Sequence, residues 1–359
     1  MALIENFDPL KDPMFQILDH EGNVVKPEFL PAWDDKKLLE VYAQMLFLRQ
    51  ADYKLINLQR QGRCGSYISI EGHEATQLGS SMALEKSDWV FPAFRELGIC
   101  YLHGVSLEKI CLYWMGNEWG SNYEANVAPV SIPVGTHPLH AVGYAWAMKI
   151  QKKSTITISY FGDGATSEGD FYEAMNFAGT MQAPTIFLCQ NNQWAISVPR
   201  SKQTVAKTLA QKSIAAGFPG IQIDGNDVFA VHTVVSEAVK RAREGKGPTL
   251  IEAILYRFGN HSTSDDATKY RPKEEIDYWR KRDPLVRFKL FLQKKNLWSE
   301  AWEQKVSDEA REKILAEVKR AEETPRPKPD DIFDYLYAKL TPELEEQKAY
   351  LLEHLKKSS

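Results

Sequence analysis

The stretch Ser154–Ser197 decides the fold, and it reads STITISYFGDGATSEGDFYEAMNFAGTMQAPTIFLCQNNQWAIS. Its first apolar run ends in Gly162-Asp-Gly164, and its second ends in Asn191-Asn192. Two apolar runs joined by a short helix predict a βαβ unit with parallel, neighbouring strands. Asp163 and Asn192 are therefore expected to meet at the carboxyl edge of a sheet, where open α/β folds bind ligands.

The sequence downstream of this unit continues the alternation of strands and helices. Residues 220–223 and 249–257 predict two further strands, and Asp227 is a suitable cap for a helix over 228–244 between them. Residues 208–216 predict a shorter helix. Residues 139–148 are apolar on all sides, which predicts a buried helix close to the sheet. This order predicts an α/β fold with a doubly wound parallel sheet.

The predicted sheet is flanked by two further segments. Residues 1–33 are expected to form an N-terminal helical arm, irregular over much of its length, with a hairpin at His20–Asn23. Residues 34–272 form the α/β domain, beginning with a helix that Asp34 or Asp35 caps. Residues 273–359 are highly charged and predict a helical C-terminal extension packed on the same unit.

Composition excludes several classes of protein. The 359 residues are 43% hydrophobic and 26% charged, with a net charge of -4, which is typical of a globular protein without a nucleic-acid or anionic-membrane partner. No apolar run approaches the roughly 18 residues of a spanning helix. The first residues lack the apolar core of a secretory signal. We therefore expect a cytoplasmic protein whose four cysteines are reduced and buried.

The residues at the predicted strand ends suit a hard cation and a diphosphate. Mg²⁺ prefers carboxylate, neutral and phosphate oxygens, and Asp163, Asn192 and the Trp194 carbonyl offer the first two kinds. Gly162 and Gly164 have no Cβ, so a diphosphate can approach the main chain. A strand, turn and helix with a capping aspartate and unrelated asparagines is the alternative. The second strand and its Asn-Asn pair favour the ligand site.

Other nucleotide and catalytic motifs are absent from this stretch. The third glycine of a dinucleotide fingerprint is missing at position 167, and Asp170 stands where a P-loop needs lysine. His73-Glu74 lacks the second histidine of a zinc-protease motif. The sequence has no Gly-x-Ser-x-Gly elbow.

Gly162-Asp-Gly164 together with Asn191-Asn192 resembles the thiamine diphosphate motif. The neighbouring stretches narrow this resemblance to the alpha subunits of 2-oxo acid dehydrogenase complexes. They are Gln59–Arg63, Gly72–Ala75, Trp89–Arg95, Gly162–Asp170, Ile223–Asp227 and Tyr256–Arg271. The form of Tyr113–Ser121 resembles the pyruvate-specific members of bacteria. The resemblance runs from about residue 35 to the C-terminus.

The resemblance implies a thiamine diphosphate-binding fold, with Mg²⁺ held by Asp163, Asn192 and the Trp194 carbonyl. The catalytic residue it implies is His261, near the reactive thiazolium carbon. Arg95 would reach the diphosphate. The full set of implied cofactor-binding residues is Phe94, Arg95, Ile132, Val134, Gly162, Asp163, Gly164, Ala165, Asn192, Trp194, Arg257 and His261. Main-chain groups of Ile132 and Val134 would face the aminopyrimidine.

Three further features bear on the resemblance. Asp170 and Glu173 share a helix face, which the family places between two active sites, and a solvated face is the alternative. The segment 120–135 is shorter than in many relatives. His137 stands where many members have glutamine. Both departures affect the aminopyrimidine and phosphate pocket rather than the metal ligands.

The implied function is the alpha subunit's part in the oxidative decarboxylation of pyruvate, with transfer of the acetyl group to a lipoyl-bearing dihydrolipoamide acetyltransferase core. The resemblance implies that a separate beta subunit, in an α2β2 heterotetramer, supplies the glutamate that activates the cofactor, and this chain offers no candidate for that glutamate. Ser262 adjoins His261, and its phosphorylation would bring negative charge into the channel. A branched-chain 2-oxo acid or acetoin dehydrogenase alpha subunit is the alternative enzyme, and a non-catalytic scaffold is the alternative of another class.

Overall fold

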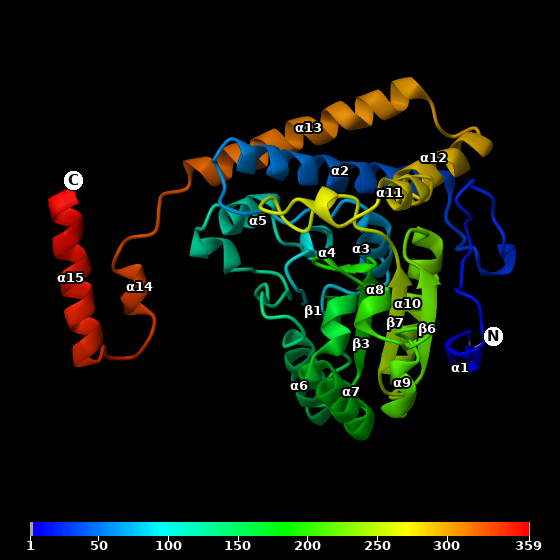
Figure 1. The fold of residues 1–359 in the computed structure, drawn as a ribbon, viewed down its shortest axis with the longest axis horizontal. Helices are drawn as coiled ribbons and strands as arrows, with labels where there is room; N and C mark the ends of the chain where they lie inside the picture. The colour runs from blue at the N-terminus through cyan, green and yellow to red at the C-terminus, as the bar shows by residue number, and fades with distance from the viewer. Residues whose placement is uncertain (1–2, 359) are drawn as a thin grey trace.

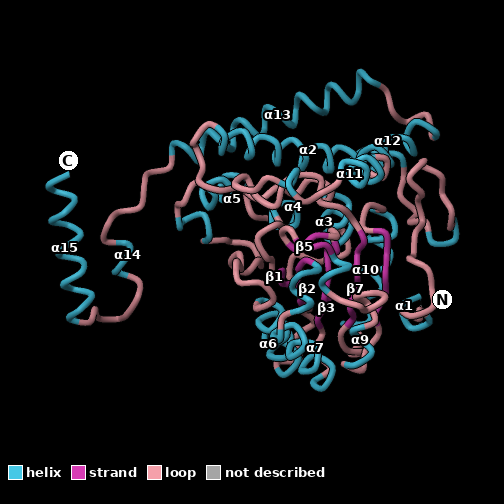
Figure 2. Tube along the Cα trace, viewed as in Figure 1, coloured by secondary structure: helices cyan, strands magenta, loops and turns pink. Residues whose placement is uncertain are grey.

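The computed structural model describes residues 3–358 and is built around a five-stranded, wholly parallel sheet (Figures 1 and 2). The strand order is β1-β2-β3-β7-β6. The strands are β1 Trp89–Phe91, β2 Thr157–Gly162, β3 Thr185–Asn191, β6 Gly220–Asp224 and β7 Thr249–Ile254. A small hairpin, β4 Trp194–Ala195 and β5 Val198–Pro199, follows β3. The predicted βαβ unit and the doubly wound α/β fold are confirmed.

Helices cover both faces of the sheet and build a second layer above it (Figure 1). The helices of the sheet region are α3 Glu74–Ser81, α4 Leu97–His103, α5 Leu107–Trp114, α6 His137–Ile150, α7 Gly169–Met181, α8 Arg200–Gln203, α9 Lys212–Ala215 and α10 Val228–Arg243. The flanking helices are α1 Leu3–Asn6, α2 Asp35–Arg60, α11 Lys273–Arg280, α12 Pro284–Lys294, α13 Glu300–Glu323, α14 Asp331–Asp334 and α15 Pro342–Ser358. Short 3-10 helices span Pro27–Phe29, Glu118–Ser121, Asp163–Ser167 and Ala267–Lys269.

Alternation along the strands divides the core into two parts. On β3, Ile186 and Leu188 pack in one apolar cluster with α3 and α10, whereas Phe187 and Cys189 pack in another with α6 and α7. Side chains of a strand point to opposite faces in turn, so a strand buried on both faces reads as a continuous apolar run. This is why the sequence predicts β2 and β3 clearly. All four cysteines are buried and free.

Helix α6 corrects one expectation, because it is buried on only one face. Ala141, Ala145 and Met148 pack inward, but Trp146 and Ile150 are 37% and 63% exposed. A helix that lies on a sheet can bury only the stripe that faces the sheet, whatever the composition of its outer face.

Two predicted boundaries are also wrong. Strand β7 ends at Ile254 rather than at residue 257, and the next residue, Leu255, donates its backbone N–H to Asn191 O at 3.0 Å. The helix predicted over 208–216 is regular only in α9, because the preceding residues are held by side-chain contacts. The backbone N–H groups of Leu209 and Ala210 donate to Glu252 at 2.7 and 3.0 Å.

The flanking segments combine local capping with long helices. Asp34 caps α2 as predicted, accepting from Lys37 N at 2.7 Å. The turn at His20–Asn23 joins residues 18 and 24 in an antiparallel bridge, as predicted. Helix α13 runs along α2, whereas α14 and α15 stand away from the body beyond the end of α13 (Figure 1). The division into segments 1–33, 34–272 and 273–359 stays a prediction.

No helix within residues 3–358 combines the length and the apolar composition needed to cross a bilayer.

Candidate active site

The carboxyl ends of β2 and β3 bring the predicted metal ligands to one cavity. The sheet register pairs Gly162 with Gln190, so Asp163 and Asn192 follow directly from adjacent strands. The cavity has a volume of about 350 Å³. The predicted residues that line it are Phe94, Arg95, Val134, Gly162, Asp163, Gly164, Ala165, Asn192, Trp194, Arg257 and His261. Ile132 is not among the lining residues and is 53% exposed.

Asp163 contributes a deeply buried carboxylate to this cavity, and the hydrogen bonding of that carboxylate is incomplete. Its side chain is 1% exposed, and its Oδ2 atom has no hydrogen-bond partner among the described residues. Burial raises the pKa of Asp163 to about 6. An unpartnered carboxylate oxygen is costly in a folded chain unless a ligand binds it. The side chain is therefore suited to a cation.

Asn192 is oriented by His73, a buried histidine that belongs to no zinc-protease motif. His73 Nδ1 lies 3.2 Å from Ile70 O, and its Nε2 lies 3.3 Å from Asn192 Nδ2. Burial, followed by the charge of Arg95, lowers the pKa of His73 well below its usual value, so the ring is neutral. The neutral tautomer that suits both contacts carries its proton on Nδ1. Nδ1–H then donates to Ile70 O, and Nε2 accepts from the Asn192 Nδ2 amide. The amide nitrogen is thereby fixed, and Asn192 Oδ1 accepts from Trp194 N at 3.3 Å.

Two buried arginines without carboxylate partners face the same cavity. Arg95 donates to the carbonyl oxygen of Ser69 and to that of His261, the latter at 3.0 Å. Arg257 donates to Trp194 O at 3.2 Å, to Ile196 O at 2.7 Å and to the Tyr270 hydroxyl at 3.0 Å. Burial, followed by the charge of Arg257, lowers the pKa of Arg95 to about 9. Buried cations of this kind normally pair with an anion, so the cavity is suited to a phosphate-bearing ligand.

His261 lies between these guanidinium groups. Its Nδ1 atom is 3.3 Å from Arg95 Nη2 and 3.3 Å from Arg257 Nη1, and its ring packs edge-on to Phe94. Burial, followed by the charges of Arg95 and Arg257, lowers the pKa of His261 to about 4. The imidazole is therefore neutral at pH 7, with Nδ1 as an acceptor.

The pKa of His261 is expected to rise when a diphosphate binds, because the anion offsets the two neighbouring guanidinium charges. Without ligand, the folded chain binds a proton at His261 less readily than the unfolded chain does, so this group reduces stability as the pH falls below about 6.5. NMR titration of isotopically labelled histidine, assigned by loss of the signal in His261→Gln, measures the pKa with and without thiamine diphosphate. A pKa that stays the same or falls on binding would contradict this assignment.

The residues present fit the thiamine diphosphate and Mg²⁺ that the resemblance implies. No group of three histidine, cysteine, aspartate or glutamate side chains that could hold a metal occurs in the described part of the chain. A cation here would instead bind the Asp163 carboxylate, neutral oxygens and the ligand's phosphate. A Cβ added to Gly164 would lie 3.0 Å from the Ala195 Cβ, so the glycine lets Ala195 pack closely against the turn. The Trp194 carbonyl oxygen accepts a hydrogen bond from Arg257, and its second lone pair can bind a cation.

The glycine turn is not followed directly by an α-helix. Residues Asp163–Ser167 form a 3-10 helix, and α7 begins only at Gly169. The N–H groups near Ala165–Ser167 are therefore those of a tight turn rather than of the α-helix. On α7, Asp170 is half-buried and Glu173 is exposed, and their predicted place between two active sites stays a prediction.

Two lining residues were missed by sequence reasoning: Ile196, just after the predicted ligands, and Gln203, further along the chain. Ile196 lines the cavity with φ +55°, a left-handed conformation that is strained for a β-branched residue. The Gln203 side-chain amide donates to Asp163 O at 2.9 Å and accepts from Gly164 N at 3.2 Å. No motif in the sequence signals either residue.

His137, flagged as a departure from the family pattern, also lines the cavity. Its Nε2 lies 2.6 Å from Tyr160 O, which identifies Nε2 as the donor and leaves Nδ1 as an acceptor without a partner among the described residues. Burial lowers its pKa to about 4. A neutral acceptor thus stands where many members carry an amide.

The expectation that this chain offers no glutamate to activate the cofactor stays a prediction, although two glutamates lie at the cavity. Glu96 and Glu168 both line the cavity. Glu96 is buried, and its two oxygens accept from Arg95 N at 2.8 Å and Gln190 Nε2 at 2.6 Å. Burial raises its pKa to about 7. Glu168 is exposed at the rim, so both differ from a free carboxylate deep in the cavity.

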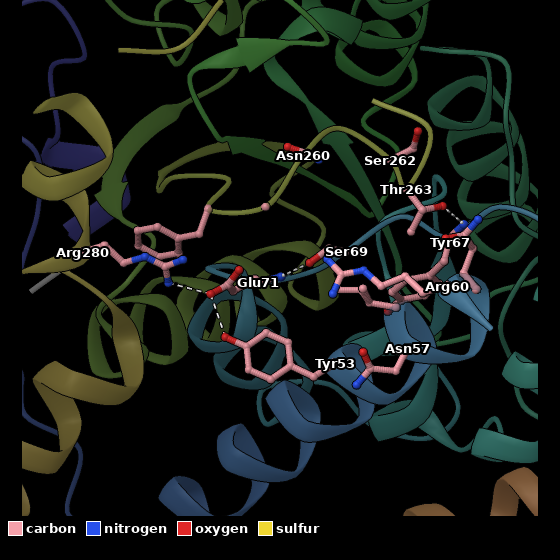
Figure 3. A pocket seen from close by; sticks show the side chains of 14 residues that line it. Tyr53, Asn57, Arg60, Tyr67, Ser69, Glu71, Asn260, Ser262, Thr263 and Arg280 are labelled. Carbon is pink, nitrogen blue, oxygen red and sulfur yellow. Dashed lines mark hydrogen bonds and ion pairs between the residues drawn. The ribbon is translucent and has the colours of Figure 1, made fainter. Parts of the chain in front are cut away.

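A second cavity, of about 490 Å³, is lined in part by Asn260, Ser262 and Thr263 (Figure 3). Helix α2, residues 67–71 and the loop 258–263 line it, and Glu71 accepts there from Tyr53 at 2.8 Å and Arg280 at 2.6 Å. Ser262 lines this second cavity, whereas His261 lines the first. The loop therefore contributes to both cavities, and a charge on Ser262 would face the second cavity rather than the one that His261 lines.

Comparison with known proteins agrees with the geometry of the strand ends. A sequence model of the family described as "Dehydrogenase E1 component" matches residues 42–330. The chain is 44% identical over 340 residues to "Pyruvate dehydrogenase E1 component subunit alpha" of Staphylococcus aureus strain Mu50, covering 94% of this chain and 92% of that protein. It is 43% identical over 321 residues to "3-methyl-2-oxobutanoate dehydrogenase subunit alpha" of Mycobacterium tuberculosis strain H37Rv, covering 88% of this chain and 87% of that protein. With a match of this extent, the chain belongs to the dehydrogenase E1 component family.

Proposed function

We propose that the chain is the alpha subunit of a pyruvate dehydrogenase. The observation that carries this proposal is the cavity at the ends of β2 and β3, where the unpartnered Asp163 carboxylate and two carboxylate-free arginines line one space. The name of the Staphylococcus aureus relative supports pyruvate as the substrate. The reaction is the decarboxylation of the 2-oxo acid with transfer of the acyl group to a lipoyl acceptor.

Each residue of the cavity has a role in this proposal. Asp163, Asn192 and the Trp194 carbonyl hold Mg²⁺, and Arg95 and Arg257 hold the diphosphate. Gly162, Gly164 and Ala165 supply the main chain beside it, and Phe94 and Val134 line the rest of the site. Ile132 does not line the cavity, and its proposed role is a main-chain contact with the aminopyrimidine of the cofactor. Thiamine diphosphate supplies the carbanion chemistry that decarboxylation of a 2-oxo acid needs.

His261 has the proposed catalytic role. Its neutral imidazole has one nitrogen between the arginines, which leaves the other to donate a hydrogen bond or move a proton at the reacting carbonyl. The arginines fix the ring, so the donor is oriented before the substrate binds.

The site requires a second polypeptide in this proposal. Glu96 is buried, but both of its oxygens already accept hydrogen bonds, and Glu168 is exposed. The carboxylate that activates the cofactor therefore comes from a beta subunit. The proposed assembly is an α2β2 heterotetramer that docks on a lipoyl-bearing acyltransferase core in the cytoplasm. The exposed Trp146 and Ile150 of α6 are consistent with such contacts.

The complex with its beta subunit is expected to turn over pyruvate faster than 3-methyl-2-oxobutanoate. The second substrate is the specific alternative, because a relative of 43% identity carries that name. The test is co-purification with candidate beta subunits, followed by kcat/KM for a panel of 2-oxo acids and acetoin. A higher kcat/KM for the branched substrate would reassign the substrate and leave the reaction class intact.

A further inference from the structure

Lys212 is a buried lysine behind the glycine turn that has no role in the proposed chemistry. Its side chain is 9% exposed, and its ammonium donates to Thr166 O at 2.6 Å and to Thr166 Oγ1 at 3.1 Å. The ammonium also lies 5.1 Å from the ring centre of Tyr172. None of these partners is a carboxylate, although a buried ammonium normally pairs with one.

The contact partner of Lys212 is directly connected to Asp163. Thr166 Oγ1 donates to Asp163 O at 2.8 Å, so the lysine, the threonine and the aspartate main chain form one hydrogen-bonded series. Both threonine oxygens that Lys212 binds lie within the turn Asp163–Ser167. The series therefore fixes the turn that presents the Asp163 carboxylate to the cavity.

The segment that carries Lys212 is itself anchored to the sheet. Glu252 on β7 accepts from the backbone N–H groups of Leu209 at 2.7 Å and Ala210 at 3.0 Å. Lys212 begins α9 two residues later. The turn after β2 is therefore tied, through Lys212, to a strand on the far side of β3.

We propose that Lys212 is a positioning residue for the metal and diphosphate site, acting through Thr166 on the turn that carries Asp163. This inference rests on the proposed function. A lysine is costly at this depth, and an apolar side chain of similar length would pack without that cost. The ammonium reaches two oxygens of one residue, which an apolar side chain cannot do. Its contribution is therefore to the geometry of the turn rather than to the stability of the fold.

The Lys212→Met variant tests this role in the full complex with its beta subunit. We expect the affinity for thiamine diphosphate, measured by calorimetry at fixed Mg²⁺, to fall about tenfold, as for other residues that orient ligands of a metal. The midpoint of chemical unfolding without cofactor should stay the same or rise. Lys212→Arg should restore most of the affinity, because the guanidinium can reach the same oxygens. Lys207→Met, an exposed lysine of the same segment, is the matched control.

The outcomes separate the two proposals. If the wild-type complex binds no thiamine diphosphate, the proposed function fails. If the wild-type complex binds it and Lys212→Met binds equally well, the role of Lys212 is refuted. A variant that loses stability but keeps full affinity would likewise show a purely structural lysine. If Lys212→Met does not fold, equal affinity of Lys212→Gln and wild type would refute the role.

Discussion

The Asp163→Asn variant should be more stable than the wild-type chain without cofactor, yet almost inactive with it. Asp163 is buried with an unpartnered oxygen, and its pKa is raised from 3.8 to about 6. A group with a raised carboxyl pKa binds a proton more readily when folded, so its charge destabilises the fold above that pKa. A difference of about two pKa units corresponds to at most about 3 kcal/mol at pH 7. Urea unfolding of both chains measures it.

The difference in stability between Asp163→Asn and wild type should depend on pH. As the pH falls from 7 through 6 towards 4, the wild-type carboxylate becomes protonated in the folded chain, and its penalty disappears. The stability gap between Asp163→Asn and wild type should therefore be widest at pH 7 and close near pH 4. A variant less stable than wild type at pH 7 would show that the carboxylate has a partner in the folded chain.

The loss of activity follows from removal of the charged metal ligand. A ligand of this kind contributes several kcal/mol, so we expect at least a roughly hundredfold loss of cofactor affinity and of kcat/KM in the complex. Asp308→Asn, an exposed aspartate on α13, is the matched control and should behave as wild type. Unchanged Mg²⁺-dependent affinity in Asp163→Asn would count against the ligand assignment.

The chain without its beta subunit should show no steady decarboxylation of pyruvate. The cavity holds Asp163 for the metal, but Glu96 is engaged by Arg95 N and Gln190, and Glu168 lies at the exposed rim. The carboxylate that activates the cofactor is therefore missing, and general acid–base assistance of this kind typically contributes 10²–10⁴-fold. The measurement is release of CO₂ from pyruvate by this chain, by the beta subunit, and by both together, each with thiamine diphosphate and Mg²⁺.

Two outcomes of that assay would change the account. Steady turnover by this chain alone would mean that Glu96 or Glu168 completes the site, and substitution of each by glutamine would identify which. A complex that assembles but binds no cofactor would favour the non-catalytic scaffold.

The sequence predicted the sheet where the strands are buried on both faces and bounded by glycine or asparagine. Strand β1 was not predicted, because the three residues Trp89–Phe91 are too few to show a pattern. Helix α6 was expected to be fully buried, because an apolar outer face has the same sequence pattern whether a partner covers it or solvent does.

The site could be predicted only where its residues follow the strands directly. Asp163 and Asn192 are fixed by the ends of neighbouring parallel strands, so their meeting was predictable. His73, which orients Asn192, lies before α3, and Gln203 lies on α8. Tertiary packing brings them to the cavity, and no spacing in the sequence records it. The exposure of Ile132 follows likewise from the path of an irregular loop.

The most direct test of the central claim is calorimetric titration of thiamine diphosphate into the complex of this chain with its beta subunit, with Mg²⁺ and with EDTA. We expect one site per pair of subunits in wild type and an affinity that falls at least about a hundredfold without Mg²⁺. We expect no such Mg²⁺ dependence in Asp163→Asn. Binding that is equally tight with and without Mg²⁺, or equally Mg²⁺-dependent in both chains, would contradict the assignment of this cavity as the metal and diphosphate site.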